Sequence, residues 1–180
     1  MDHALSSRRL EPRCRRAEPD VLFAAALAIL GVVGMTQGGW IFAKAQLAQI
    51  LLERAFNESV DTGKPVKPWS WADTWPVARI EVPRLGARVI ALVGSSGQAL
   101  AFGPGHVEGT PEPGEPGTAV FAAHRETHFN FLKDVVIGDG IDIVGRDGGR
   151  STFRVTATSV VRWDASGIDA GGPGRRLVLS

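Results

Sequence analysis

The chain opens on one long apolar run and then changes to short alternating segments. Residues 21–43 carry no charged side chain, and Thr36 and Gln37 are the polar interruptions of the run. A helix over this run, at about 1.5 Å per residue, is about 34 Å long and crosses a hydrocarbon core of about 30 Å. The pattern therefore predicts a transmembrane helix at 21–43.

Basic residues fix the expected orientation of that helix. The segment before the run contains Arg8, Arg9, Arg13, Arg15 and Arg16. The next basic residue is Lys44, and Trp40 lies near the far boundary, where an indole is favoured. The positive-inside bias predicts a cytoplasmic tail over residues 1–20 and places residues from 44 onward outside the membrane.

Two other interpretations of the apolar run are a cleaved signal peptide and a buried core helix. A cleaved signal peptide is possible, because Ala43, Lys44 and Ala45 loosely resemble a cleavage site and a basic stretch precedes them. The run is long for a signal peptide, however, and a lysine beside the cleavage site is unfavourable. A buried core helix fits poorly, because no charge interrupts the run. We expect an uncleaved anchor.

A stalk and linker are expected over residues 44–75. Leu47, Ile50, Leu51 and Ala55 recur at helical spacing, which predicts an amphipathic extension of the anchor. Prolines and glycines then break the helix in a stretch that holds three tryptophans. These are Trp69, Trp71 and Trp75. We expect the indoles to pack onto the following domain, with a carbohydrate-facing or lipid-facing aromatic patch as the alternative.

From residue 76 the chain reads as short strands separated by turns. Apolar or alternating segments lie at 77–82, 88–93, 98–102, 118–123, 141–144, 152–163 and 177–180. One helical turn is expected near 129–135, and no other helix after residue 60. Short strands at this spacing predict a mainly β domain over 76–180, built as a barrel or sandwich.

Composition narrows the choice of partners. The net charge is +1, which argues against a nucleic-acid partner by bulk electrostatics. Cys14 is the single cysteine, so no intrachain disulfide can form. It precedes the apolar run, on the side of the membrane where thiols stay reduced.

The spacing of two histidines suggests a metal site. His124 and His128 are four apart with Glu126 between them. Such a pair binds zinc when a helix places both rings on one face, but His124 ends a predicted strand. The order also differs from H-E-x-x-H, and a third ligand is not evident. We expect no metal and no cofactor.

The stretch around these histidines resembles the sortase family. Residues 100–144 read LAFGPGHVEGTPEPGEPGTAVFAAHRETHFNFLKDVVIGDGIDIV, with the family's order of turns, buried strand and histidine motif. The segments PWSWADTWPVARIEVPRLG and HRETHFNFL point to class GN, the sortases of Gram-negative bacteria. The resemblance covers roughly residues 38–180. Ala123, Thr118 and Glu126 are mild departures from the usual glycine, asparagine and aspartate.

The resemblance implies a sortase-like β-barrel and a cysteine transpeptidase. In the family, a thiolate attacks the carbonyl after threonine in an LPXTG-like sorting signal, and an amine resolves the acyl-enzyme. His124 matches the family's catalytic histidine, the proton donor and acceptor. His106, Arg125 and His128 are candidates to support it by hydrogen bonds, and each has a purely structural role as its alternative.

The resemblance also implies which groups are missing. Residues 177–180 match the front of the strand that ends in the family's Thr-Cys, and the family's arginine lies on the next strand. We therefore expect the catalytic cysteine and arginine to be absent from these residues, and the barrel to be incomplete at its C-terminus. Cys14 lies across the membrane and does not substitute.

The expected partners follow from the same resemblance. They are a surface protein that bears the sorting signal, an amine acceptor and the membrane. The expected location is the inner membrane, with a single span, a cytoplasmic N-terminus and a periplasmic catalytic domain. The alternative function is a non-catalytic, membrane-anchored β-domain that binds peptide or a surface-protein partner.

Overall fold

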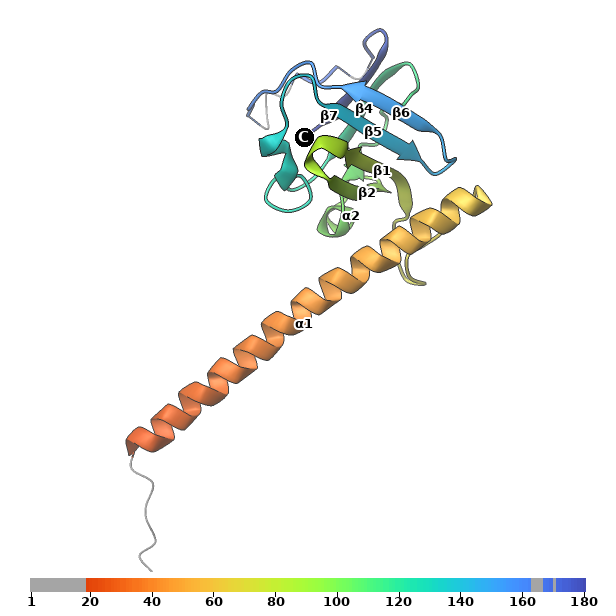
Figure 1. The fold of residues 1–180 in the computed structure, drawn as a ribbon. Helices are drawn as coiled ribbons and strands as arrows, with labels where there is room; N and C mark the ends of the chain where they lie inside the picture. The colour runs from red at the N-terminus through yellow and green to blue at the C-terminus, as the bar shows by residue number, and fades with distance from the viewer. Residues whose placement is uncertain (1–18, 163–166, 170) are drawn as a thin grey trace, which may run out of the picture. The chain divides into compact units, whose positions relative to one another are not determined.

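The structure is a computed structural model that describes residues 19–162, 167–169 and 171–180. The basic tail, with His3 and Cys14, and Trp163 lie outside the described residues. The chain forms two units, residues 1–43 and residues 44–180, which are considered separately below. Figure 1 shows the order of the elements.

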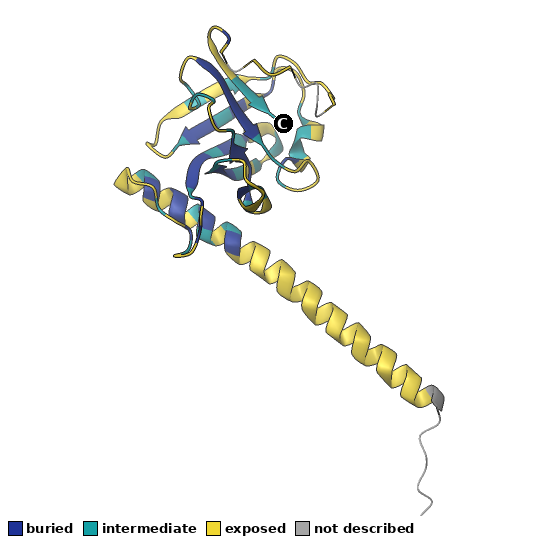
Figure 2. Ribbon diagram, turned by 180° about the vertical axis from the view of Figure 1, so that it is seen from behind, coloured by how far each residue is buried: buried dark blue, intermediate teal, exposed yellow. Residues whose placement is uncertain are grey.

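The first helix, α1 (Pro19–Thr62), contains the predicted span. Every residue from 21 to 43 is exposed, as the yellow ribbon of Figure 2 shows. From Val21 onward the helix is long and apolar enough to cross a membrane. An exposed apolar surface of this length has no favourable place in water, so the helix suggests a single membrane span.

The later part of α1 belongs to the second unit and packs on the β-domain. Leu52 and Phe56 are fully buried and form a cluster with Ile90, Leu92 and Val144. Positions four apart lie on one face of a helix, so this stripe faces the domain while its neighbours face outward. The predicted amphipathic extension is present and reaches Thr62.

Seven strands form a single sheet that curves into a nearly closed barrel (Figure 1). In chain order the strands are β1 (Pro76–Val82), β2 (Ala87–Val93), β3 (Gly105–His106), β4 (Gly117–Ala122), β5 (Gly140–Gly145), β6 (Arg150–Arg154) and β7 (Arg175–Leu179). Their order across the sheet is β6-β5-β1-β2-β3-β4-β7. Only the β2–β3 and β4–β7 pairs among these strands are parallel. The predicted mainly β barrel is confirmed.

The barrel interior is filled by the inward-facing residues of these strands. Ala78, Ile80 and Val82 alternate along β1 with side chains that are more exposed, and they meet Phe121 of β4 and Ile143 of β5. This alternation is the period of two that a strand with one buried face requires. A cavity of about 520 Å³ remains where β6 and β7, the two ends of the sheet, approach each other.

The expected strand at 98–102 is wrong, because the chain forms helix α2 (Gly97–Phe102) there. Ser96 caps the helix by accepting a hydrogen bond from the Ala99 N–H. The residues that follow include alanine and leucine, which are strong helix formers. Ala99 is fully buried, so one apolar face of this short helix packs inward.

The expected strand at 152–163 is too long. β6 ends at Arg154, which pairs with Gly140, the first residue of β5. Val155 makes the last ladder-like hydrogen bonds, to Asp139 and Gly138, each 2.9 Å. Residues 156–162 lie beyond the point where β5 begins, so they have no partner strand. They form no strand in the described part of the chain.

The final predicted strand forms as β7 but is not buried. Leu177, Val178 and Leu179 are half-exposed, because β7 lies at one end of the sheet and pairs with β4 alone among the described strands. The short helix η2 (Asn130–Asp134) accounts for the expected turn near 129–135, and η1 (Pro83–Leu85) joins β1 to β2.

The three linker tryptophans do not share one environment. Trp75 packs against the barrel core, and Trp69 meets Phe102 edge-on at a ring-centroid distance of 5.0 Å. Trp71 is 80% exposed. The expectation that all three indoles pack onto the domain is therefore wrong for Trp71.

An ion pair joins η1 to the turn before β5. The Arg84 guanidinium donates to both carboxylate oxygens of Asp139, at 2.5 and 2.7 Å, and to the carbonyl of Asp134 at 2.6 Å. Asp139 is almost fully buried. The hydrogen bonds from Arg84, and then from the Val136 N–H, lower the pKa of Asp139 to about 2. A bidentate pair of this kind fixes both turns relative to each other.

We expect Phe56→Ala to destabilise the domain by about 3–5 kcal/mol, because it empties a fully buried aromatic site. Ile50→Ala is the matched control on the same helix, since Ile50 is exposed, and its effect should stay within about 0.5 kcal/mol. Thermal unfolding of the full chain in detergent, followed by near-UV circular dichroism, measures both. Equal effects of the two variants would contradict the docking of α1 on the barrel.

Candidate active site

The parallel pairing of β4 with β7 brings two strand ends to one edge of the barrel. Phe121 pairs with Leu179 in the register. Beyond it, the Ser180 N–H donates to the Phe121 carbonyl at 2.9 Å, and the Ala123 N–H donates to the Ser180 carbonyl at 2.8 Å. Carboxyl ends of parallel strands meet at the same edge, so the end of β7 lies beside the residue that precedes His124.

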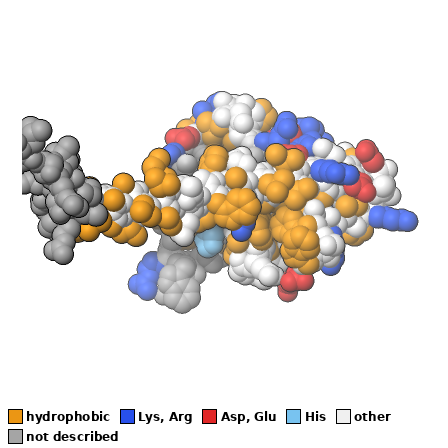
Figure 3. All heavy atoms as spheres, turned by 90° about the horizontal axis from the view of Figure 1, so that it is seen from below, with side chains coloured by type: hydrophobic (Ala, Val, Ile, Leu, Met, Phe, Trp, Pro, Cys, Tyr) orange, Lys and Arg blue, Asp and Glu red, His pale blue; other side chains and the backbone are white. Residues whose placement is uncertain are grey.

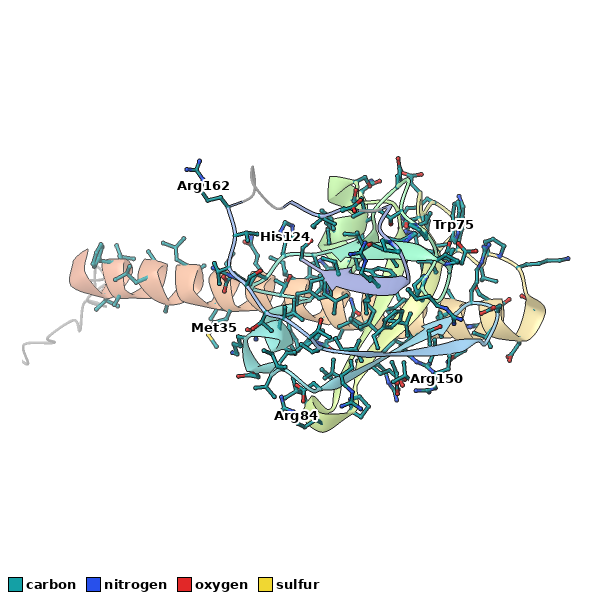
Figure 4. The ribbon with its side chains drawn as sticks, turned by 90° about the horizontal axis from the view of Figure 1, so that it is seen from above. Met35, Trp75, Arg84, His124, Arg150 and Arg162 are labelled. Carbon is teal, nitrogen blue, oxygen red and sulfur yellow. The ribbon has the colours of Figure 1, made fainter. Side chains whose placement is uncertain are left out.

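His124 lies in a short loop that its own backbone organises. Its carbonyl accepts hydrogen bonds from the Thr127 N–H at 3.1 Å and from the Phe129 N–H at 3.3 Å. Phe129 is only 1% exposed and anchors the loop in the barrel core. The imidazole of His124 is exposed. Figure 4 shows it on the opposite side of the domain from Arg84 and Arg150 in that view.

His128 lies in the same loop but is half-buried. Its Nε2 is 3.5 Å from the Ala101 carbonyl of α2. Burial lowers the pKa of His128, the Ala101 carbonyl raises it, and the nearby charge of His124 lowers it further. The net shift is downward, so the ring is neutral at pH 7. The structure therefore brings His128 close enough to His124 for the two rings to interact electrostatically.

His106 is held inside the domain. It lies on β3 opposite Phe121, and the two rings pack at a centroid distance of 5.1 Å. Its Nε2 lies 3.0 Å from the Pro111 carbonyl and 3.2 Å from Thr110 Oγ1. Since the Pro111 carbonyl can only accept, Nε2 carries the proton. This histidine closes the loop after β3 against β4, the strand that leads to His124.

Arg125 faces solvent. Its guanidinium pairs with the Glu126 carboxylate at 2.8 Å, and the two side chains are 83% and 78% exposed. Exposed pairs of this kind contribute little to stability. The Arg125 side chain hydrogen-bonds to Glu126. Its support of His124 stays a prediction.

The described residues contain no group of three or more histidine, cysteine, aspartate or glutamate side chains placed to hold a metal ion. His124 and His128 are neighbours without a third donor. An exposed imidazole at this edge of the barrel, beside the end of β7, is suited to proton transfer.

Sequence patterns missed one part of this site. The Ala101 carbonyl that meets His128 belongs to α2, a segment expected to be a strand. The signal was present in Ser96, a favoured helix N-cap, followed by alanine and leucine. Its six residues were too short for a helical period to be recognised.

A mainly β barrel with an imidazole at its edge, beside the end of a parallel strand, defines a candidate for acyl-transfer chemistry. The family model for the sortase domain matches residues 80–180, which is more than half of the chain. The chain belongs to the sortase family, whose members are cysteine transpeptidases.

Solved sortase structures resemble the chain in fold. A variant of sortase E from Streptomyces avermitilis is 27% identical with a TM-score of 0.51, over 58% of this chain and 78% of that one. Sortase C-1 from Actinomyces oris is 28% identical with a TM-score of 0.52, over 58% and 61%. A lid mutant of sortase A from Corynebacterium diphtheriae shows the shared fold at 22% identity and a TM-score of 0.55, over 74% and 83%. No curated protein matches the chain.

We expect His124→Gln to raise the pKa of His128 toward the ordinary value of 6.5, because it removes one of the two causes that lower this pKa. Titration of the imidazole resonances by NMR, on the full chain in detergent, measures the shift. Arg125→Gln is the control in the same loop and should leave His128 unchanged. A His128 pKa that does not respond to His124→Gln would show that the two rings do not interact.

Proposed function

We propose that the chain is a class GN sortase, which cleaves an LPXTG-like sorting signal and transfers the acyl group to an amine. Membership in the sortase family and the meeting of β4 and β7 beside His124 support this proposal. The class rests on two segments, PWSWADTWPVARIEVPRLG and HRETHFNFL. The meeting of the two strand ends is the observation that carries the assignment of the site.

His124 acts as the proton donor and acceptor in this proposal. A thiolate attacks the carbonyl carbon after threonine, the peptide C–N bond breaks, and the His124 imidazolium gives its proton to the departing amine. An acceptor amine then attacks the thioester, His124 takes its proton, and the thiolate leaves. Residues 177–180 match the front of the strand that ends in the family's Thr-Cys, and this strand lies at the edge where His124 lies.

The neighbouring histidines support His124 by different means. His128 is neutral at pH 7, so it adds no positive charge that would oppose protonation of His124. His106 fixes the loop after β3 through its contacts with Pro111 and Phe121. Arg125 lies at the rim of the site, where it pairs with Glu126.

The proposed organisation follows the chain. Residues 1–20 form the cytoplasmic tail, 21–43 the anchor in the inner membrane, 44–75 the stalk and linker, and 76–180 the catalytic domain in the periplasm. The proposed partners are a surface protein with a sorting signal and an amine acceptor. The exposed apolar part of α1 supports the anchor.

The second candidate is a non-catalytic, anchored β-domain that binds peptide. Cys14 is the single cysteine of these 180 residues and precedes the apolar run. We expect the polypeptide of these residues alone, in vesicles, to leave an LPXTG-type peptide uncleaved, since the mechanism requires a thiolate at the site. Mass spectrometry of the peptide measures cleavage, with an active sortase as the positive control. Turnover above the blank would contradict the proposed thiol mechanism.

The site itself can be tested by placing a thiol at the end of β7. In a Cys14→Ser background, we expect Ser180→Cys to react with iodoacetamide at neutral pH faster when His124 is present than in the His124→Ala variant. A positive neighbour lowers a thiol pKa, and roughly one unit gives about a tenfold larger thiolate fraction near pH 7.

Ser70→Cys is the control for this experiment, because residue 70 is an exposed position in the linker. Its alkylation rate should not depend on His124. Equal dependence of the two thiols on His124, or no dependence at Ser180→Cys, would overturn the assignment of this barrel edge as the active site.

A further inference from the structure

An apolar groove lies on the domain, and none of its lining residues belongs to the histidine loop. Its volume is about 370 Å³, and residues of α1, the linker and α2 line it. The large lining side chains are Leu47, Leu51, Trp69, Trp71 and Phe102. Figure 3 shows hydrophobic side chains gathered over this part of α1 and the neighbouring face of the domain.

The groove exposes large hydrophobic side chains. Trp71 and Leu47, which line the groove, are 80% and 55% exposed. Ile50 of α1 does not line the groove and is 65% exposed. The opposite stripe of the helix, with Leu52 and Phe56, already seats α1 on the barrel. The outer apolar stripe is therefore not needed for folding, and exposed apolar patches of this kind mark interaction surfaces.

The groove is tied by the chain to the end of the apolar run. Leu47 is four residues beyond Ala43, and even a fully extended chain spans at most about 3.6 Å per residue, so Leu47 lies within about 15 Å of that end. The headgroup region on each side of a bilayer is about 5–7.5 Å deep. One wall of the groove is thus held within reach of the membrane surface whenever residues 21–43 span the bilayer.

The lining has the chemistry of a membrane interface. Indole rings favour the headgroup level, where the ring is half in apolar surroundings and its N–H stays hydrated. Lys44 and Asp73 are the charged lining residues, one of each sign. A groove with apolar walls and balanced charges fits zwitterionic headgroups and the first carbons of their acyl chains.

We propose that this groove is a membrane-docking surface, in which Trp71 inserts at the headgroup level and the groove accepts lipid. The proposal rests on the proposed membrane anchor and adds a second contact, made by the β-domain itself. Two contacts restrict rotation of the domain about the anchor, so the histidine loop is presented in a fixed direction relative to the membrane surface.

Labelling of the full chain in phosphatidylcholine vesicles tests the proposal. In a Cys14→Ser background, Trp71→Cys carries an environment-sensitive fluorophore, and Ile137→Cys is the matched control. Ile137 is 68% exposed and does not line the groove. We expect lipids brominated near the headgroup to quench the label at position 71 and to leave the label at position 137 unaffected.

A second measurement avoids labelling. Brominated lipid should quench less of the tryptophan fluorescence in Trp71→Phe than in the unchanged chain. The quenched amount should not fall in Trp75→Phe, because Trp75 packs against the barrel core. Carbonate extraction reports separately whether the chain spans the vesicle membrane.

Each other outcome overturns the docking surface. An inserted chain whose label at 71 is as open to aqueous iodide as the label at 137 rejects the groove while keeping the anchor. A label at 71 that is shielded from iodide but not quenched by brominated lipid shows that protein covers the groove. A chain that carbonate removes from vesicles rejects the anchor as well.

Discussion

The parallel contact between β4 and β7 is the constraint on which the candidate site depends. Parallel neighbours need a long crossover, and here residues 123–174 provide it, including β5 and β6. The crossover returns the chain to the side of β4, so that Ser180 bonds to Phe121 and Ala123. Without this register the end of β7 would not lie beside the residue that precedes His124.

The second constraint is that α1 carries two apolar stripes, one buried against the domain and one exposed. Leu52 and Phe56 bury one stripe of the helix against β2, α2 and β5, while Gln49 donates to the Phe102 carbonyl at 2.9 Å. Leu47 and Ile50 form a second stripe that stays open. A helix that served only as a tether would have no reason to carry apolar side chains on both sides of this segment. The packing therefore separates a structural face from a face available to the surroundings.

Burial divides the three described histidines by role. His106 is buried and bonded through Nε2, His128 is half-buried with a lowered pKa, and His124 is exposed. His106 lies on β3, and the loop with His124 and His128 follows β4, the strand that pairs with β3. In the proposed mechanism the exposed ring of His124 meets the substrate, while His106 and His128 make contacts inside the domain.

Sequence patterns predicted most of the strands and the family of this protein. Alternation predicted most of the strands, and the motif around His124 identified the family, because buried strand faces and turn residues are locally encoded. The β6 end, the helix α2 and the exposure of Trp71 were not predictable in this way. The end of β6 depends on where its neighbour β5 begins, α2 is too short to show a period, and the exposure of Trp71 depends on how the linker packs.

The same division holds for the site. The sequence by itself determined which side chain is the proton-transfer candidate and that the other described histidines accompany it. The tertiary structure decided that His106 is locked inward, that His128 is lowered in pKa by burial against α2, and that β7 ends beside His124. These are contacts between segments far apart in the chain, and no local pattern of residues encodes them.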